Sequence, residues 1–145
     1  APAIMVRPLD VSGATVQKTI WRSTDAIPSW SWHGYEGRTA QIQVYSGDDE
    51  VELFLNGRSL GVKPTGAPAG FTARYRVAYE PGELVAEGRR GGQVTGRATL
   101  RSAAAARLRL RVDAPSGEDA PDALFVWAEI ADDDGTVDTA AHAAV

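Results

Sequence analysis

Short runs of alternating hydrophobic and polar residues make up most of the chain, and turn-forming residues separate them. The clearest run is residues 51–55, in which Val and Leu alternate with Glu52 and Phe54. This period of two is typical of a strand with one buried face. Asn56-Gly57 follows and supplies two residues that tolerate positive φ, as a type I′ turn requires. With residues 58–62 as the partner strand, the stretch predicts a β-hairpin.

Further runs with the same period predict more strands. They cover residues 15–21, 40–45, 71–79, 84–86, 94–100, 108–112 and 124–132, with residues 29–33 as an extended segment. In two of these runs the alternation also predicts which side chains share a face of the strand. Phe71 is expected on the same face as Tyr75, and Val94 on the same face as Leu100. Pro81-Gly82 fits the centre of a type II turn, because proline fixes φ and glycine accepts a positive φ.

The spacing of these strands predicts an all-β fold. Many short strands with turn signals between them favour an immunoglobulin-like β-sandwich, which we assign to residues 1–103, with residues 1–20 as a linker or lead-in segment. Ser102–Ala106 is interpreted as a linker, because five residues between strands do not sustain an isolated helix. Residues 104–145 are then this linker and the first strands of a second, truncated β-domain, since a complete sandwich needs about a hundred residues.

Composition removes several classes of function. The net charge of −4 and the pI of about 5.1 argue against a nucleic-acid partner. The absence of cysteine excludes disulfides, thiolate metal sites and a cysteine nucleophile. No apolar run is long enough to span a membrane, so no membrane partner is expected. Residues 1–7 lack an initiator Met and a signal-peptide pattern, which predicts an internal piece of a longer chain and leaves its compartment open.

The titratable residues do not form a convincing catalytic or metal site. Glu50 and Glu52 share a strand face, and a retaining glycosidase needs two carboxyl groups about 5–5.5 Å apart, but we interpret this pair as solvated strand carboxylates. His33 and His142 offer neither a metal-ligand cluster nor the setting of a nucleophile. The acidic run Asp132–Asp134 fails the ligand spacing of a calcium loop and is interpreted as a turn. We assign no catalytic residue, no metal site and no cofactor.

Aromatic residues supply the candidate binding site. Trp30 and Trp32 are two residues apart and project to the same side of an extended segment, with His33 and Tyr35 close by. Flat aromatic pairs can stack on sugar rings, so these four are candidate carbohydrate-binding residues. The alternative, which we prefer for the tryptophans, is packing into the core or against a neighbouring domain, because a buried aromatic side chain removes about 150–250 Å² from water.

Three stretches of the sequence also carry a family resemblance. Val51–Gly57 (VELFLNG) and Tyr75–Gly88, with its central Pro81-Gly82, resemble the immunoglobulin-like domains that follow the catalytic barrel in glycoside hydrolase family 2 β-galactosidases. Ile27–Gly34 is similar to an HWNW segment of those domains, with Pro28-Ser29 where that pattern has a His before its first Trp. These stretches cover much of the chain, and the VELFLNG block is the most specific of them.

The resemblance implies a non-catalytic accessory domain. Its partners would be the catalytic barrel and the neighbouring β-domains of the parent chain, and residues 108–113 and 128–135 resemble the opening strands of the next domain. The parent is implied to hydrolyse β-galactosides with two carboxylates of its barrel, and none of those catalytic motifs is present in this chain. Two alternatives stay open, a carbohydrate-binding module built on Trp30 and Trp32, and a tandem immunoglobulin-like module of a bacterial surface protein.

Overall fold

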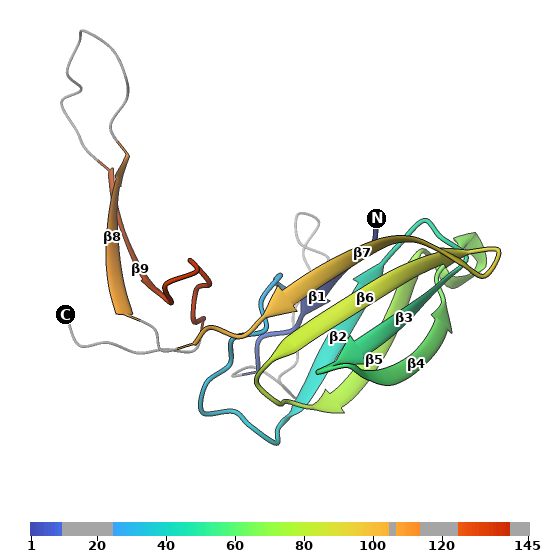
Figure 1. Cartoon of the computed structure of the whole chain (residues 1–145), viewed down its shortest axis with the longest axis horizontal. Coiled ribbons are helices and arrows are strands. Elements are labelled where there is room, and N and C mark those ends of the chain that lie inside the picture. The colour runs from blue at the N-terminus through green and yellow to red at the C-terminus, as the bar shows by residue number, and fades with distance from the viewer. Residues whose placement is uncertain (10–24, 105–106, 114–124, 140–145) are drawn as a thin grey trace, which may run out of the picture.

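A computed structural model describes residues 1–9, 25–104, 107–113 and 125–139, and these residues form nine β-strands and no α-helix (Figure 1). Seven of the strands form two facing sheets, and the last two form a separate hairpin. Within the described ranges, the chain has no helix with the length and apolar character that crossing a membrane would require. The all-β prediction is therefore confirmed.

The two sheets of the sandwich are antiparallel and contain three and four strands. The three-stranded sheet has the order β1 (Ala3–Val6), β2 (Thr39–Tyr45) and β5 (Thr72–Ala78). The four-stranded sheet has the order β4 (Arg58–Pro64), β3 (Glu50–Leu55), β6 (Glu83–Arg90) and β7 (Gln93–Arg101). The fourth strand thus pairs with the third, whereas in a constant-type immunoglobulin sandwich the fourth strand extends the opposite sheet.

The core lies between the two sheets and is filled by every second residue of the inner strands. In β3, Val51, Leu53 and Leu55 are fully buried while the residues between them are half-buried. Ile42 and Val44 of β2 face them from the other sheet and are also fully buried. The alternation in the sequence thus corresponds to the inner and outer faces of a two-layer sandwich.

The predicted hairpin turn between β3 and β4 is confirmed and has a second role. Asn56 and Gly57 have φ of 51° and 80°, as a type I′ turn requires. The Asn56 carboxamide also reaches the β5–β6 turn, where its Nδ2 donates to the Pro81 carbonyl at 3.1 Å and its Oδ1 accepts from Glu83 N at 2.9 Å. Gly82, with φ of 136°, lies so close that an added Cβ would be 1.9 Å from Asn56 Oδ1.

The first strand of the sandwich is where the sequence predicted a linker or lead-in segment. Ala3–Val6 pairs with β2, and Ile4 and Val6 are buried in the core. Four residues show too few alternations to stand out beside Pro2 and Pro8, so the pattern missed this strand. The strand predicted at residues 15–21 lies outside the described residues.

Two residues leave the strand face that the alternation predicted for them. Phe71 is 51% exposed, because it precedes β5 with φ of 59° and so leaves the alternation of the strand. Val94 is 47% exposed. Between Gly88–Gly96 and Arg89–Val94 the register of β6 and β7 shifts, which leaves Thr95 as an extra residue of a bulge.

The connections outside the sandwich also differ in detail from the prediction. β4 continues to Pro64, two residues beyond the predicted strand, and the loop that follows contains the short 3₁₀ helix η2 (Ala67–Ala69). Residues 102–104 have no regular secondary structure, and residues 105–106 of the predicted linker lie outside the described ranges.

The second unit is an antiparallel hairpin of β8 (Arg107–Asp113) and β9 (Phe125–Ala131) that stands apart from the sandwich in Figure 1. The pairs Leu108–Ile130, Leu110–Ala128 and Val112–Val126 lie opposite one another and give one apolar face. The three β8 residues of this face are 50%, 68% and 54% exposed. The predicted Leu124, at the start of the second strand, lies outside the described residues, and the assignment of 104–145 to a second domain stays a prediction.

Candidate functional site

The candidate aromatic segment runs from Ser29 to Tyr35, just before β2, and the structure divides it between core and surface. Trp30 is fully buried and Trp32 is 3% exposed, so both indoles are part of the sandwich core. Ser31, between them, is also buried at 3% exposure.

Each indole also has its polar group satisfied inside the protein. Trp30 Nε1 donates to the Glu80 carbonyl at 3.0 Å, and its ring meets Tyr79 edge to face with centroids 4.8 Å apart. Trp32 Nε1 donates to the Ser29 carbonyl at 3.3 Å. Buried aromatic rings with a satisfied polar group are typical of core packing.

The Tyr79 hydroxyl fixes the backbone of this segment. It donates to the Trp30 carbonyl at 3.1 Å and accepts from Trp32 N at 3.0 Å. Ser102 Oγ donates to the same Trp30 carbonyl at 2.5 Å and accepts from Gly82 N at 3.1 Å. The tryptophan segment is thereby bound to the β5–β6 turn and to the end of β7. No pattern in the sequence pointed to this role of Tyr79 and Ser102.

The other two predicted residues lie at the surface. The His33 side chain is 84% exposed, and its Nδ1 is 3.7 Å from Glu36 Oε1. Tyr35 is half-buried, with the Arg38 guanidinium 5.3 Å from its ring centroid. The four residues therefore do not form one exposed aromatic face. Sugar contact at Trp30 and Trp32 stays a prediction, and it would require both indoles to leave the core.

Glu52, one of the two acidic residues predicted to share a face of β3, is engaged with neighbouring side chains on the outer face of the sheet. Glu52 accepts a hydrogen bond from Ser59 Oγ at 2.6 Å and forms an ion pair with Arg89. Arg89 also contacts Glu87 at 3.3 Å, and Glu87 lies directly opposite Glu52 across the strands. One arginine thus holds two facing carboxylates that would otherwise repel each other.

The acidic run after β9 forms the predicted turn and is organised by one carboxylate. Asp132 is 4% exposed, and its Oδ1 accepts from Asp134 N at 3.0 Å and from Thr136 N at 2.8 Å. Its Oδ2 accepts from Ala104 N at 2.9 Å. These backbone hydrogen bonds, with that from Ala104 the strongest cause, hold the pKa of Asp132 below its usual range.

The remaining acidic and histidine side chains do not form a metal site in the part of the chain that the structure describes. Among the described residues, no group of three or more His, Asp or Glu side chains is arranged to hold a metal ion. His142 lies outside the described residues.

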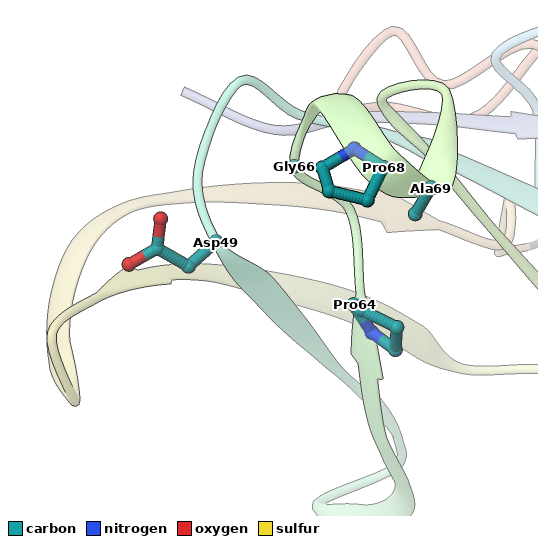
Figure 2. Close-up of a pocket in the computed structure, with 5 residues that line it drawn as sticks. All are labelled: Asp49, Pro64, Gly66, Pro68 and Ala69. Atoms are coloured by element: carbon teal, nitrogen blue, oxygen red, sulfur yellow. The ribbon is translucent and has the colours of Figure 1, made fainter.

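A shallow apolar hollow of about 360 Å³ lies at the η2 end of the sandwich. Figure 2 shows its lining of Asp49, Pro64, Gly66, Pro68 and Ala69. Its single carboxylate, Asp49, accepts a hydrogen bond from Gly91 N at 3.1 Å. The hollow offers proline rings and a methyl group to a ligand, and it lacks the converging polar groups of a small-molecule site.

Comparisons with known proteins identify relatives of this fold. A family model described as "Domain of unknown function (DUF4982)" matches residues 37–96. The β-galactosidase BoGH2A of Bacteroides ovatus is 34% identical over 114 residues, which is 77% of this chain and 13% of that protein. A putative β-glucuronidase of Formosa agariphila is 38% identical over 79 residues, which is 53% of this chain and 8% of that protein.

Solved structures agree with these matches. A glycosyl hydrolase family 2 member from Bacteroides cellulosilyticus superposes with a TM-score of 0.72 at 32% identity, over 92% of this chain and 18% of that chain. The chain therefore spans less than a fifth of the length of these relatives.

Proposed function

Because the chain is homologous to a segment of glycoside hydrolase family 2 proteins, we propose that it is a non-catalytic accessory β-sandwich within a longer family 2 enzyme. The observation that carries the proposal is the match over 92% of this chain to only 18% of a family 2 structure. The geometry supports a structural role, since the tryptophans pack in the core and Glu52 is ion-paired.

The parent enzyme is proposed to be a β-glycosidase. The resemblance and the relative named β-galactosidase favour β-galactosides, hydrolysed by the two-carboxylate retaining mechanism in a catalytic barrel. The relative named as a putative β-glucuronidase makes β-glucuronides the second candidate. The specificity pocket would lie in the barrel, so this chain does not decide between the two.

The first experiment is to determine the open reading frame around this segment. The full enzyme and the pure chain are then each assayed with a chromogenic β-galactoside and a chromogenic β-glucuronide. We expect a barrel with two strand-end glutamates in the same frame, turnover by the full enzyme and none by the pure chain. A frame of β-domains alone would favour the surface-module alternative. Turnover by the pure chain that is lost in the Glu50→Gln/Glu52→Gln variant would overturn the proposal.

A further inference from the structure

Several hydrogen bonds join the sandwich to the β8–β9 hairpin, in addition to the chain that connects them. We infer that residues 102–104 and the loop that follows β9, residues 132–139, form a closed hydrogen-bonded junction that holds the hairpin in one orientation relative to the sandwich. This inference does not depend on the proposed function.

Each of the three residues after β7 is held by the surrounding structure. Ser102 N donates to the Gly82 carbonyl at 2.8 Å. Ala103 N donates to Ser31 Oγ at 2.7 Å. Ala104 N donates to Asp132 Oδ2 at 2.9 Å. The first two bonds fix the segment to the sandwich, and the third fixes it to the loop after β9.

The loop after β9 returns to the sandwich at a second point. Thr139 Oγ1 donates to the Ser31 carbonyl at 2.6 Å and lies 2.9 Å from Ser29 Oγ. Ser31 is 3% exposed and therefore holds both arms of the junction, Ala103 through its hydroxyl and Thr139 through its carbonyl.

The loop itself is fixed onto β9, so the constraint reaches the hairpin. The Asp132 carboxylate stabilises the turn by accepting hydrogen bonds from Asp134 N and Thr136 N. Asp138 N donates to the Ile130 carbonyl of β9 at 2.7 Å. The contacts thus run in a ring from Ser31 through Thr139 and Asp132 to Ala104 and back to the sandwich. A ring of contacts restricts rotation, whereas an open chain of small residues would be flexible.

Hydrogen bonds rather than apolar packing carry this constraint. A cleft of about 310 Å³ lies beside them, lined by Trp30, Leu100 and Val137 among others. Val137 is 40% exposed, so apolar side chains do not close the space between the two units. The orientation should therefore depend on Asp132 and Thr139, whose side chains make the bonds that cross the junction.

A distance measurement between the two units tests the inference. The chain contains no cysteine, so Gln93→Cys at the start of β7 and Leu108→Cys at the junction end of β8 give two unique sites for nitroxide labels. Double electron–electron resonance should give one narrow distance distribution. The Asp132→Asn/Thr139→Val variant should widen it by about twofold or more, because an amide NH2 would face backbone N–H donors and valine cannot donate.

Matched controls separate loss of the junction from loss of the fold. Asp134→Asn and Thr99→Val make the same changes at exposed neighbours and should leave the distribution narrow. Near-ultraviolet circular dichroism should show that the core tryptophans are unchanged in every variant. A broad distribution in the unsubstituted chain, or an equally narrow one in the double variant, would overturn the inference.

A second measurement needs no substitution in the junction. The amides of Ala103 and Ala104 should be protected from hydrogen exchange, since each donates to a described partner. Exchange of both amides at the rate of an unstructured chain would contradict a closed junction.

Discussion

Trp30 shows how burial decides the role of an aromatic residue. Its side chain is fully buried, its ring packs on Tyr79, and its one donor is bound to the Glu80 carbonyl. Replacing it with alanine would leave a large cavity, so Trp30→Ala should lower the free energy of unfolding by about 3–5 kcal/mol. Urea denaturation monitored by circular dichroism would measure this.

The control for that prediction is the exposed neighbour of the same segment. His33→Ala should change the free energy of unfolding by no more than about 0.5 kcal/mol, because its side chain is 84% exposed. If Trp30→Ala leaves stability unchanged and instead abolishes binding of a galactoside, Trp30 is a ligand contact and not a core residue.

Asn56 combines a backbone and a side-chain contribution, and two substitutions separate them. Asn56→Gly keeps the positive φ and removes the bonds to Pro81 and Glu83, so it should cost about 1–2 kcal/mol. Asn56→Ala should cost about 1 kcal/mol more, because alanine also pays for the left-handed conformation. Urea midpoints of the three proteins check the order, and a glycine variant as stable as the unsubstituted chain would show that the side-chain bonds contribute nothing.

At the scale of single elements, the β8–β9 hairpin is held at one end only. The Arg107–Ala131 pair lies next to the junction, and Ala131 is fully buried. The apolar face beyond it is exposed, and an isolated two-stranded hairpin is marginally stable. Hydrogen-exchange protection should therefore fall from Arg107 and Ala131 toward Asp113 and Phe125.

The strands of the sandwich provide the reference for this gradient. Amides of β3 and β6, which pair with each other in the middle of the four-stranded sheet, should exchange more slowly than any amide of the hairpin. Uniform protection along β8 and β9 at the level of β3 would mean that the exposed apolar face is covered, for example by a second copy of the chain.

The elements that could be predicted from the sequence are those whose information is local. The alternation of residues 51–55 and the Asn56-Gly57 turn contain the strand, its buried face and its hairpin within a few residues. The face predicted for Val94 is wrong because the bulge at Thr95 depends on the register between β7 and β6, which the sequence of one strand does not encode. The face predicted for Phe71 is wrong because this residue lies between η2 and β5 and has a positive φ.

The candidate site was predictable only in part for the same reason. The spacing of Trp30 and Trp32 predicts that they share one side of the segment, but it does not predict whether that side faces the core or the solvent. The residues that decide this, Tyr79 and Ser102, contact Trp30 across separations of 49 and 72 positions. No local pattern reports contacts between residues so far apart in the sequence.

At the scale of the whole molecule, the shifted pKa values of three side chains predict how the stability of the fold depends on pH. Hydroxyl hydrogen bonds from Thr95 and then Ser46 hold the pKa of Asp48 below its usual range, and backbone N–H groups led by Ala104 do the same for Asp132. Burial, and after it the charge of Glu52, raises the pKa of Tyr75 to about 12.

The signs of these shifts set both limits of the stable range. A lowered carboxyl pKa stabilises the fold fully above the ordinary pKa of about 3.9, and this contribution is lost as the pH falls through the lower folded value. A raised tyrosine pKa stabilises the fold fully below the ordinary pKa of about 10, and this contribution is lost as the pH rises toward the folded value. The urea midpoint should thus be level near neutral pH and fall on both sides.

One substitution tests the alkaline limit by itself. Tyr75→Phe removes the titrating hydroxyl, which donates to the Val51 and Gly61 carbonyls, so it should lower the midpoint at neutral pH and flatten its fall above about pH 10. Tyr45→Phe, a half-buried tyrosine of β2, should leave that fall in place. If the fall persists unchanged in Tyr75→Phe, the alkaline limit belongs to another group, and the buried hydroxyl of Tyr75 does not link the fold to pH.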